Sequence, residues 1–189
     1  MAKAVDRVRR RKDILDAAVR VFARKGFAAS RVEDVAAEAG IAKGSVYLYF
    51  DSRDALLAGV FESYRARSDA VLATVGEGPA LERLARLVGE VVDMLATHRD
   101  HARVLLDVWA SAPSLDMAAV YRQYREAISA LLRQARAEGQ LRPDVSEHHA
   151  TLIVATIEGC LLQWLTDDRV PLTDLAAPII ELTVEGIRA

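Results

Sequence analysis

Residues 14–57 of this 189-residue chain read ILDAAVRVFARKGFAASRVEDVAAEAGIAKGSVYLYFDSRDALL. Apolar side chains recur in this stretch at the three- and four-residue spacing of an amphipathic helix. Gly26 and Gly40 follow two of these stripes, at points where a helix can end in a left-handed turn. The pattern predicts short helices, the last two separated by residues 39–42, as in a helix-turn-helix over about residues 30–50.

Helical periodicity continues to the end of the chain, and no segment alternates as a strand does. Residues 51–52 can cap a fourth helix, and a Gly-Glu-Gly-Pro break at residues 76–79 separates the basic end from a larger body. Five more apolar stripes follow, at about 81–95, 104–109, 117–135, 147–165 and 175–187. Pro178 lies inside the last stripe, so the start of that helix is left open. The fold class we expect is all-α, with about nine helices.

The charges are unevenly distributed along the chain. Residues 1–55 carry 12 basic and 8 acidic side chains, whereas the remainder carries 13 and 19. A basic end on an acidic body suggests that this end approaches a polyanion. A single cysteine, Cys160, allows no intrachain disulfide, and no signal peptide or membrane span is visible. We therefore expect a cytoplasmic protein, with no metal, no cofactor and no catalytic site.

The third short helix presents two different faces. Val46 and Phe50 are four residues apart and point to the core. Lys43 and Tyr47 share another face, with Ser45 beside them. One positive charge, hydroxyl donors and apolar ring area suit the major groove of DNA.

These residues resemble the DNA-binding domain of the tetracycline-repressor (TetR) family, over about residues 9–65. The matching features are Phe22 leading to Gly26-Phe27, the Ala39-Gly40 helix end, Lys43-Gly44-Ser45-Val46-Tyr47 followed by Tyr49-Phe50, and the basic Arg53 before a leucine pair. The resemblance implies a three-helix DNA-binding domain at residues 1–52. It also implies a helical ligand-binding and dimerisation domain at residues 53–189.

The resemblance also implies contacts for single residues. Those expected to bind DNA are Ser30, as a cap of the second helix, Arg31, Lys43, Gly44, Ser45, Tyr47, Tyr49 and Arg53. Arg53 stands where the family has a phosphate-gripping lysine, and Ala42 stands where a serine is common. Arg31 replaces a small hydroxyl, which leaves open whether it contacts phosphate or is solvated. The basic run 7–12 is either an arm for the minor groove or a tail without a defined contact.

Two further sets of residues are expected in the body. Those expected to line an effector pocket between the fourth and eighth helices are Met94, Leu105, Trp109, Tyr121 and Tyr124. Those expected at a two-fold dimer interface are Ile153, Ile157, Gly159, Leu161, Trp164, Ile179 and Leu182.

The function that we expect is a homodimeric repressor, released from a palindromic operator by a small apolar or aromatic ligand. The alternative is a dimeric DNA-binding regulator without such a ligand, controlled by a protein partner or by its own concentration. A closed, fully packed body would favour that alternative. A helical enzyme would need a cluster of titratable side chains, and the sequence shows none.

Overall fold

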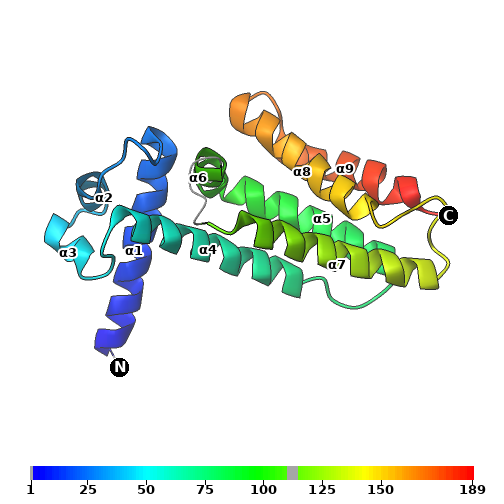
Figure 1. The fold of residues 1–189 in the computed structure, drawn as a ribbon, viewed down its shortest axis with the longest axis horizontal. Coiled ribbons are helices and arrows are strands. Elements are labelled where there is room, and N and C mark those ends of the chain that lie inside the picture. The colour runs from blue at the N-terminus through cyan, green and yellow to red at the C-terminus, as the bar shows by residue number, and fades with distance from the viewer. Residues whose placement is uncertain (1, 110–114) are drawn as a thin grey trace. The chain divides into compact units, whose positions relative to one another are not determined.

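A computed structural model describes residues 2–109 and 115–189 of the chain (Figure 1). Within these residues there are nine α-helices and two short 3-10 helices, and no β-strand. The predicted all-α fold class is therefore confirmed. The helices gather into two compact units, the first made of residues 1–65 and 100–115, the second of residues 66–99 and 116–189.

The first unit contains the helix-turn-helix. Its helices are α1 (Ala2–Lys25), α2 (Val32–Glu38), α3 (Lys43–Tyr47), the first part of α4 (Arg53–Ala73) and most of α6 (Arg99–Trp109). One apolar core holds these helices together, and Phe22, Val35, Val46 and Leu56 are almost fully buried in it. Burying a side chain of this size stabilises the fold by about 1.5–3 kcal/mol. The predicted core positions Val46 and Phe50 are both buried.

The turns of this unit depend on two glycines. Gly26 ends α1 with a φ of 77°, and Gly40 lies between α2 and α3 with a φ of 66°. Both values lie in the left-handed region that glycine adopts without steric cost. The predicted helix end at Gly26 and turn at Gly40 are thus confirmed.

The cap of α2 differs from the prediction. The N-cap residue is Arg31, and its backbone N–H donates to the Asp34 carboxylate at 2.9 Å. Ser30 is 1% exposed, and its hydroxyl donates instead to the Gly26 carbonyl at 2.6 Å. The expectation that Ser30 caps the second helix is wrong, because Asp34 satisfies the helix start and Ser30 closes the preceding loop.

The helix α4 starts as the sequence predicts and crosses α1 closely. The Ser52 hydroxyl accepts the Ala55 N–H at 3.0 Å, which caps the helix. Further along, a Cβ placed on Gly59 would lie 2.8 Å from Leu15 and 3.0 Å from Phe50. The absence of a side chain at Gly59 therefore lets α1 and α4 approach each other.

The helix α6 packs with the first unit, although it follows α5 in the chain. Val104 and Val108 are buried in the same core as α1, and the Asp107 carboxylate accepts the Phe27 N–H at 2.9 Å. The compact units thus differ from the expected domains, which placed everything after residue 52 in one body. Which functions the segments 1–52 and 53–189 carry stays a prediction.

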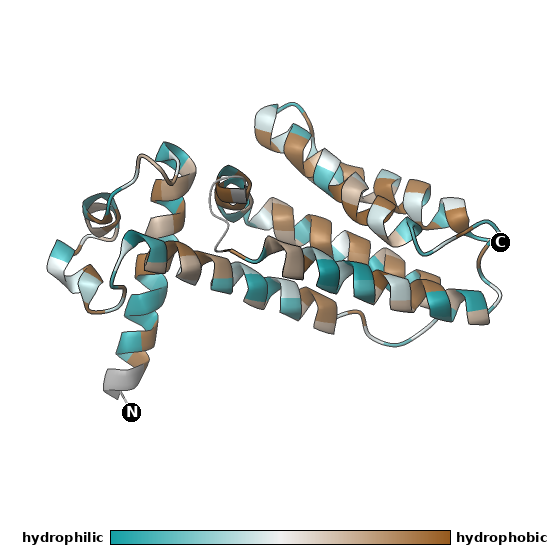
Figure 2. Ribbon diagram, in the orientation of Figure 1, coloured by the Kyte–Doolittle hydropathy of each residue, from teal (hydrophilic) through white to brown (hydrophobic). Residues whose placement is uncertain are grey.

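The second unit is a helical bundle. Besides the last part of α4, it contains α5 (Ala80–Thr97), α7 (Met117–Ala137), α8 (His149–Thr166) and α9 (Ala176–Thr183). Two 3-10 turns, at Leu172–Leu175 and Glu185–Ile187, also belong to it. The helix α5 packs against α7 and α9, and α7 packs against α8. Apolar and polar residues alternate around α5 and α7 (Figure 2), as expected of helices with one buried side. No helix in residues 2–109 or 115–189 has the length and apolar character of a membrane span.

The helix α8 begins later than its sequence pattern, and α9 begins in the region where the sequence left the start open. The helix α8 starts at His149, slightly after the stripe expected from about residue 147, and the His149 ring nitrogen Nδ1 accepts the Ser146 N–H at 3.0 Å. Pro178 is the third residue of α9. Proline fits a first helical turn because the N–H groups there lack partners within the helix.

Candidate nucleic-acid interface

The helix α3 turns one side to solvent. Val46 is fully buried, whereas Lys43 and Gly44 are exposed, Tyr47 is 43% exposed and Leu48, just after the helix, is 72% exposed. No atom lies within 4 Å of a Cβ placed on Gly44, so nothing covers the backbone there. A short helix held by one buried valine thus presents a cation, a phenol and an aliphatic side chain together.

Lys43 is paired with an acidic residue of α2. Its ammonium lies 2.5 Å from the Glu33 carboxylate and 5.8 Å from the centre of the Tyr47 ring. Hydrogen bonding to Lys43 lowers the pKa of the Glu33 carboxyl, and the same bond raises the pKa of Lys43. Both side chains are about half exposed, so water screens the pair and a DNA phosphate can compete with Glu33 for Lys43.

The residues that follow α3 lie near the N-terminal half of α1. Tyr49 is partly buried, and the Arg7 guanidinium lies 6.0 Å from the centre of its ring. The Arg11 guanidinium lies 5.0 Å from the ring of Phe50. The run 7–12 is part of the helix α1. Whether it reaches the minor groove stays a prediction.

Ion pairs join α2 to α1. Glu38 accepts hydrogen bonds from Arg20 at 2.7 Å and from Arg24 at 3.0 Å, and Asp34 accepts one from Lys25 at 2.6 Å. These bonds lower the pKa of both carboxyl groups. The orientation of α2, and with it the turn to α3, is thus fixed by charges as well as by the apolar core.

Arg53 stabilises the loop before α2 in this conformation. Its Nη1 donates to the carbonyls of Ala28 and Ser30, at 3.1 and 3.0 Å, and its guanidinium stacks 4.3 Å from the Phe27 ring centre. Arg53 thus holds the loop before α2, and the expected phosphate contact of this residue stays a prediction. The Ser30 hydroxyl is buried and bonded to the Gly26 carbonyl, and a contact of this residue with DNA stays a prediction. Arg31 and Lys43 remain exposed.

Two residues near this surface were missed by the sequence interpretation. Leu48 lies off the apolar stripe of Val46 and Phe50, which is the signal that marks it as exposed. Glu33 pairs with a residue ten positions away, and such a contact across a turn leaves no spacing signal in the sequence.

The residues expected around an effector are not gathered in one described pocket. The two described pockets are lined by other residues of α7 and of the segment before α8. Leu105 is buried and belongs to the first unit, whereas Met94, Tyr121 and Tyr124 belong to the second. The side chain of Trp109 lies outside the described residues.

Tyr124 carries a buried polar group that already has a partner. The side chain is 7% exposed, and its hydroxyl donates to the Ser68 hydroxyl at 3.1 Å. Burial raises the pKa of this phenol. Tyr124 therefore stays neutral at physiological pH and behaves as a core residue that is satisfied by α4.

The residues expected at a dimer interface divide into two groups. Ile153, Ile157 and Ile179 are at most 6% exposed and pack in the core of the single chain, and their contact with a partner stays a prediction. Gly159 and Leu182 are exposed, and Leu161 and Trp164 are half-buried. The apolar residues that remain open on this unit are Leu152, Leu162 and Leu182.

No group of three or more potential metal ligands occurs among the residues that the structure describes. The exposed surface of α3 on a helix-turn-helix unit instead defines a class of DNA-binding regulator. Comparison with known proteins gives the family. The model of bacterial regulatory proteins of the tetR family matches residues 14–60, and that of the BetI-type transcriptional repressor C-terminal domain matches residues 80–187. The chain belongs to the TetR family and is a DNA-binding transcriptional regulator of the repressor type.

Several relatives match along almost the whole chain. The repressor KstR2 of Mycobacterium tuberculosis is 30% identical over 195 residues, covering 94% of this chain and 95% of the relative. The fatty acid metabolism regulator protein of Bacillus subtilis is 27% identical over 181 residues, covering 92% and 93%. The structure of FadR from Bacillus subtilis in complex with stearoyl-CoA superposes with a TM-score of 0.79 at 26% identity, covering 93% and 98%.

Proposed function

We propose that this protein is a cytoplasmic, homodimeric repressor that binds a palindromic operator through α3 and releases it when a small molecule binds. The observation that carries the DNA contact is the open face of α3. Lys43 and Tyr47 project from a short helix that the buried Val46 holds in place, and the exposed Leu48 directly follows it. A rigid helix with such a face is the part that a helix-turn-helix inserts into the major groove.

Each residue of this face has a distinct role in the proposal. The Lys43 ammonium exchanges Glu33 for a phosphate or a guanine edge. Gly44 lets the sugar-phosphate backbone approach, since nothing covers it. Leu48 supplies apolar contact for a thymine methyl group, and Tyr47 supplies both ring area and a hydroxyl. No catalytic role is proposed for any residue.

Selection from a random pool of duplex DNA tests the operator. The proposal expects an enriched sequence with two-fold symmetry, whose half-sites lie about one helical turn, roughly 34 Å, apart. Enrichment of a single half-site, or of no sequence, would remove the palindromic operator. The control is the Arg169→Ala variant, which is changed at a highly exposed position of the second unit and should select the same sequence.

The dimer surface that we propose is the exposed side of α8 together with α9. Leu152, Gly159 and Leu162 recur along one stripe of α8, and Leu182 is exposed on α9. Three exposed leucines in a small unit form an apolar surface that a partner can cover. The glycine between two of them permits close packing of two helices. This set replaces the buried isoleucines and keeps Gly159 and Leu182 from the sequence prediction.

Sedimentation tests the dimer directly. The wild-type chain is expected to sediment as a dimer at micromolar concentration, and Leu152→Glu/Leu162→Glu as a monomer because charge would be buried at the interface. Arg169→Glu introduces charge at an exposed site of the same unit and should leave the dimer intact. A monomeric wild-type protein would contradict the proposal.

The similar proteins indicate the chemistry of an effector. A relative of 27% identity regulates fatty acid metabolism, and FadR of Bacillus subtilis was solved with stearoyl-CoA. We propose a ligand with a long acyl chain, in line with the small apolar effector expected from the sequence. Adding stearoyl-CoA to the operator complex should release DNA, whereas CoA without the acyl chain should release less.

The packing of Tyr124 favours the rival function, a regulator without a small-molecule effector. Its hydroxyl is satisfied by Ser68, and the described pockets omit the residues expected around a ligand. If stearoyl-CoA, stearate and other apolar ligands all leave operator affinity unchanged, this rival replaces the ligand-responsive function. The DNA-binding part of the proposal would stand.

A further inference from the structure

One side of α7 carries all of its arginines. Arg122, Arg125, Arg133 and Arg136 follow one another at spacings of three, eight and three residues, and Ser129 fills the gap. Residues three and four apart on a helix are neighbours, with Cβ atoms about 5–6 Å apart. The five side chains therefore form one continuous strip, which we call the arginine strip.

Most of these arginines lack a counter-charge. Elsewhere in the second unit Arg99, Arg142 and Arg188 are paired with Asp168, Asp144 and Glu185. Within the described part of the chain, by contrast, Arg122, Arg125 and Arg133 make no ion pair or hydrogen bond. Like charges at helical spacing repel one another, so an anion bound along the strip would relieve this repulsion.

Two open pockets lie along the arginine strip. The first, of about 350 Å³, is lined by Arg122, Arg125, Glu126, Ser129 and Arg133. Three arginines thus line this pocket together with only one carboxylate, that of Glu126. The pocket is polar and positively charged, and the guanidinium fork matches the oxygens of a phosphate in geometry and charge.

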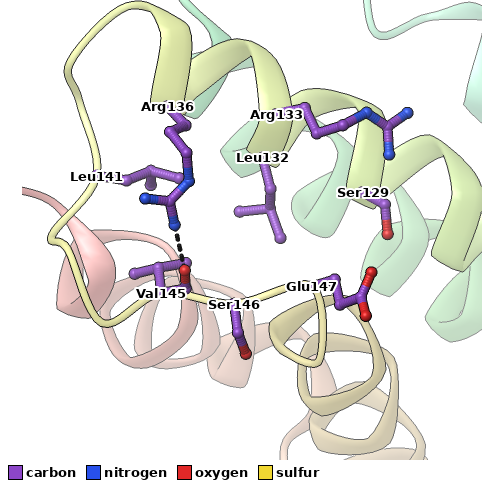
Figure 3. Close-up of a pocket in the computed structure, with 8 residues that line it drawn as sticks. All are labelled: Ser129, Leu132, Arg133, Arg136, Leu141, Val145, Ser146 and Glu147. Carbon is purple, nitrogen blue, oxygen red and sulfur yellow. Dashed lines mark hydrogen bonds between the residues drawn. The ribbon is translucent and has the colours of Figure 1, made fainter.

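The second pocket, of about 310 Å³, adjoins the first through Ser129 and Arg133 (Figure 3). Its floor contains the apolar side chains Leu132, Leu141 and Val145, and Leu132 points toward the chain before α8. Arg136 is held by a hydrogen bond to the Val145 carbonyl and forms a wall. Ser146 and Glu147 complete the lining.

We propose that the arginine strip binds a phosphate ester that also carries a ring or another apolar group. The phosphates would lie on Arg122, Arg125 and Arg133, and the apolar part on Leu132, Leu141 and Val145. An adenosine diphosphate group has this combination. It occurs both as a free nucleotide and as the end of coenzyme A, so the test includes both sources.

Calorimetry on the protein without DNA tests the site separately from the proposed operator binding. The probes are ADP, coenzyme A, inorganic pyrophosphate and adenosine, each at about 0.1 M salt because screening matters at exposed charges. ADP or coenzyme A should bind saturably, once per chain, and more tightly than pyrophosphate or adenosine. Tighter binding of coenzyme A than of ADP would assign the site to the larger cofactor.

Two variants test the residues. Arg125→Gln/Arg133→Gln should weaken ADP binding about tenfold or more, since two charged phosphate ligands are lost. Ser129 lines both pockets, so Ser129→Trp would fill space in them without changing the charge and should weaken binding as well. The matched control is Arg169→Gln/Arg188→Gln, which removes the same charge elsewhere in the second unit and should bind as wild type.

Three results would overturn the proposal. The first is the absence of saturable binding of ADP and coenzyme A up to about 1 mM, which is weak for a specific ligand. The second is equal weakening in both double variants, which would indicate a general charge effect. The third is a loss of duplex DNA binding in Arg125→Gln/Arg133→Gln without any ADP binding to wild type, which would make the strip a nucleic-acid surface.

Discussion

The two units of this chain treat their charges differently. Around α2, in the first unit, Glu38, Asp34 and Glu33 each hold a basic side chain of α1 or α3. Along α7, in the second unit, Arg122, Arg125 and Arg133 have no such partner among the described residues. The basic side chains around α2 are therefore already paired, and in the proposed DNA contact a phosphate would displace Glu33 from Lys43. The second surface already carries the charge that would attract an anion.

The largest expected effect concerns the core of the first unit. Phe22 is 1% exposed and its ring meets that of Phe27 edge to face, with centroids 5.2 Å apart. Phe22→Ala should lower the free energy of unfolding by about 3–5 kcal/mol. Val8→Ala, at a 72% exposed position of the same helix, should change it by less than about 0.5 kcal/mol. Urea unfolding followed by circular dichroism measures both, and similar losses in the two variants would contradict the packing described.

A smaller effect tests whether α6 belongs to the first unit. Asp107→Ala leaves the Phe27 N–H without the carboxylate that accepts it at 2.9 Å. The expected loss of stability is about 1 kcal/mol, typical of one hydrogen bond. Asp93→Ala removes an exposed carboxylate from α5 and serves as the control. If both variants unfold at the same urea concentration, the hydrogen bond from the Phe27 N–H to the Asp107 carboxylate does not contribute measurably to the free energy of unfolding.

The pair of Glu33 and Lys43 offers a way to sharpen the comparison. Glu33→Gln frees Lys43 and removes a negative charge from the side of α2 near α3, so operator affinity should rise about two- to fivefold. The gain should shrink as salt is added, because screening weakens exposed charges. Affinity measured by fluorescence anisotropy over a salt series checks this. Unchanged or weaker binding would show that Glu33 does not compete with DNA.

The smallest effect is the acid response of the first unit. Hydrogen bonds from Arg20 and Arg24 hold the pKa of Glu38 below its ordinary value of 4.5. This pairing stabilises the fold above that ordinary value and is lost as the pH falls through the lowered one. The Tm of wild type should therefore fall as the pH drops below about 4.5, and that of Glu38→Gln should fall less. Parallel curves for the two proteins would contradict the assignment.

The sequence was sufficient for the helix-turn-helix because its signals are local. The left-handed Gly26 and Gly40, the buried Val46 and Phe50, and the Ser52 cap all follow from neighbouring residues. The prediction of Ser30 as the helix cap was wrong because Ser30 precedes the helix by one residue more than expected. Its hydroxyl donates a hydrogen bond to the Gly26 carbonyl instead.

The body was harder to predict because its signals are not local. The helix α8 is apolar on several sides, so the sequence could not tell Ile153 and Ile157, which pack inside the chain, from Leu152 and Leu162, which stay exposed. The bond from Tyr124 to Ser68 spans 56 positions and left no pattern to find. The arginine strip did have a signal, the helical spacing of four like charges on α7, and it went unused.

The central claim is that α3 provides the DNA contact, and operator affinity of the Lys43→Ala/Tyr47→Ala variant tests it most directly. Both side chains are exposed, so the fold should be unaffected and circular dichroism should match wild type. We predict a loss of about tenfold for each residue at low salt, as expected for contacts in the major groove, with Arg169→Ala binding as wild type. If the double variant binds the operator as tightly as wild type over the salt series, α3 is not the reading helix.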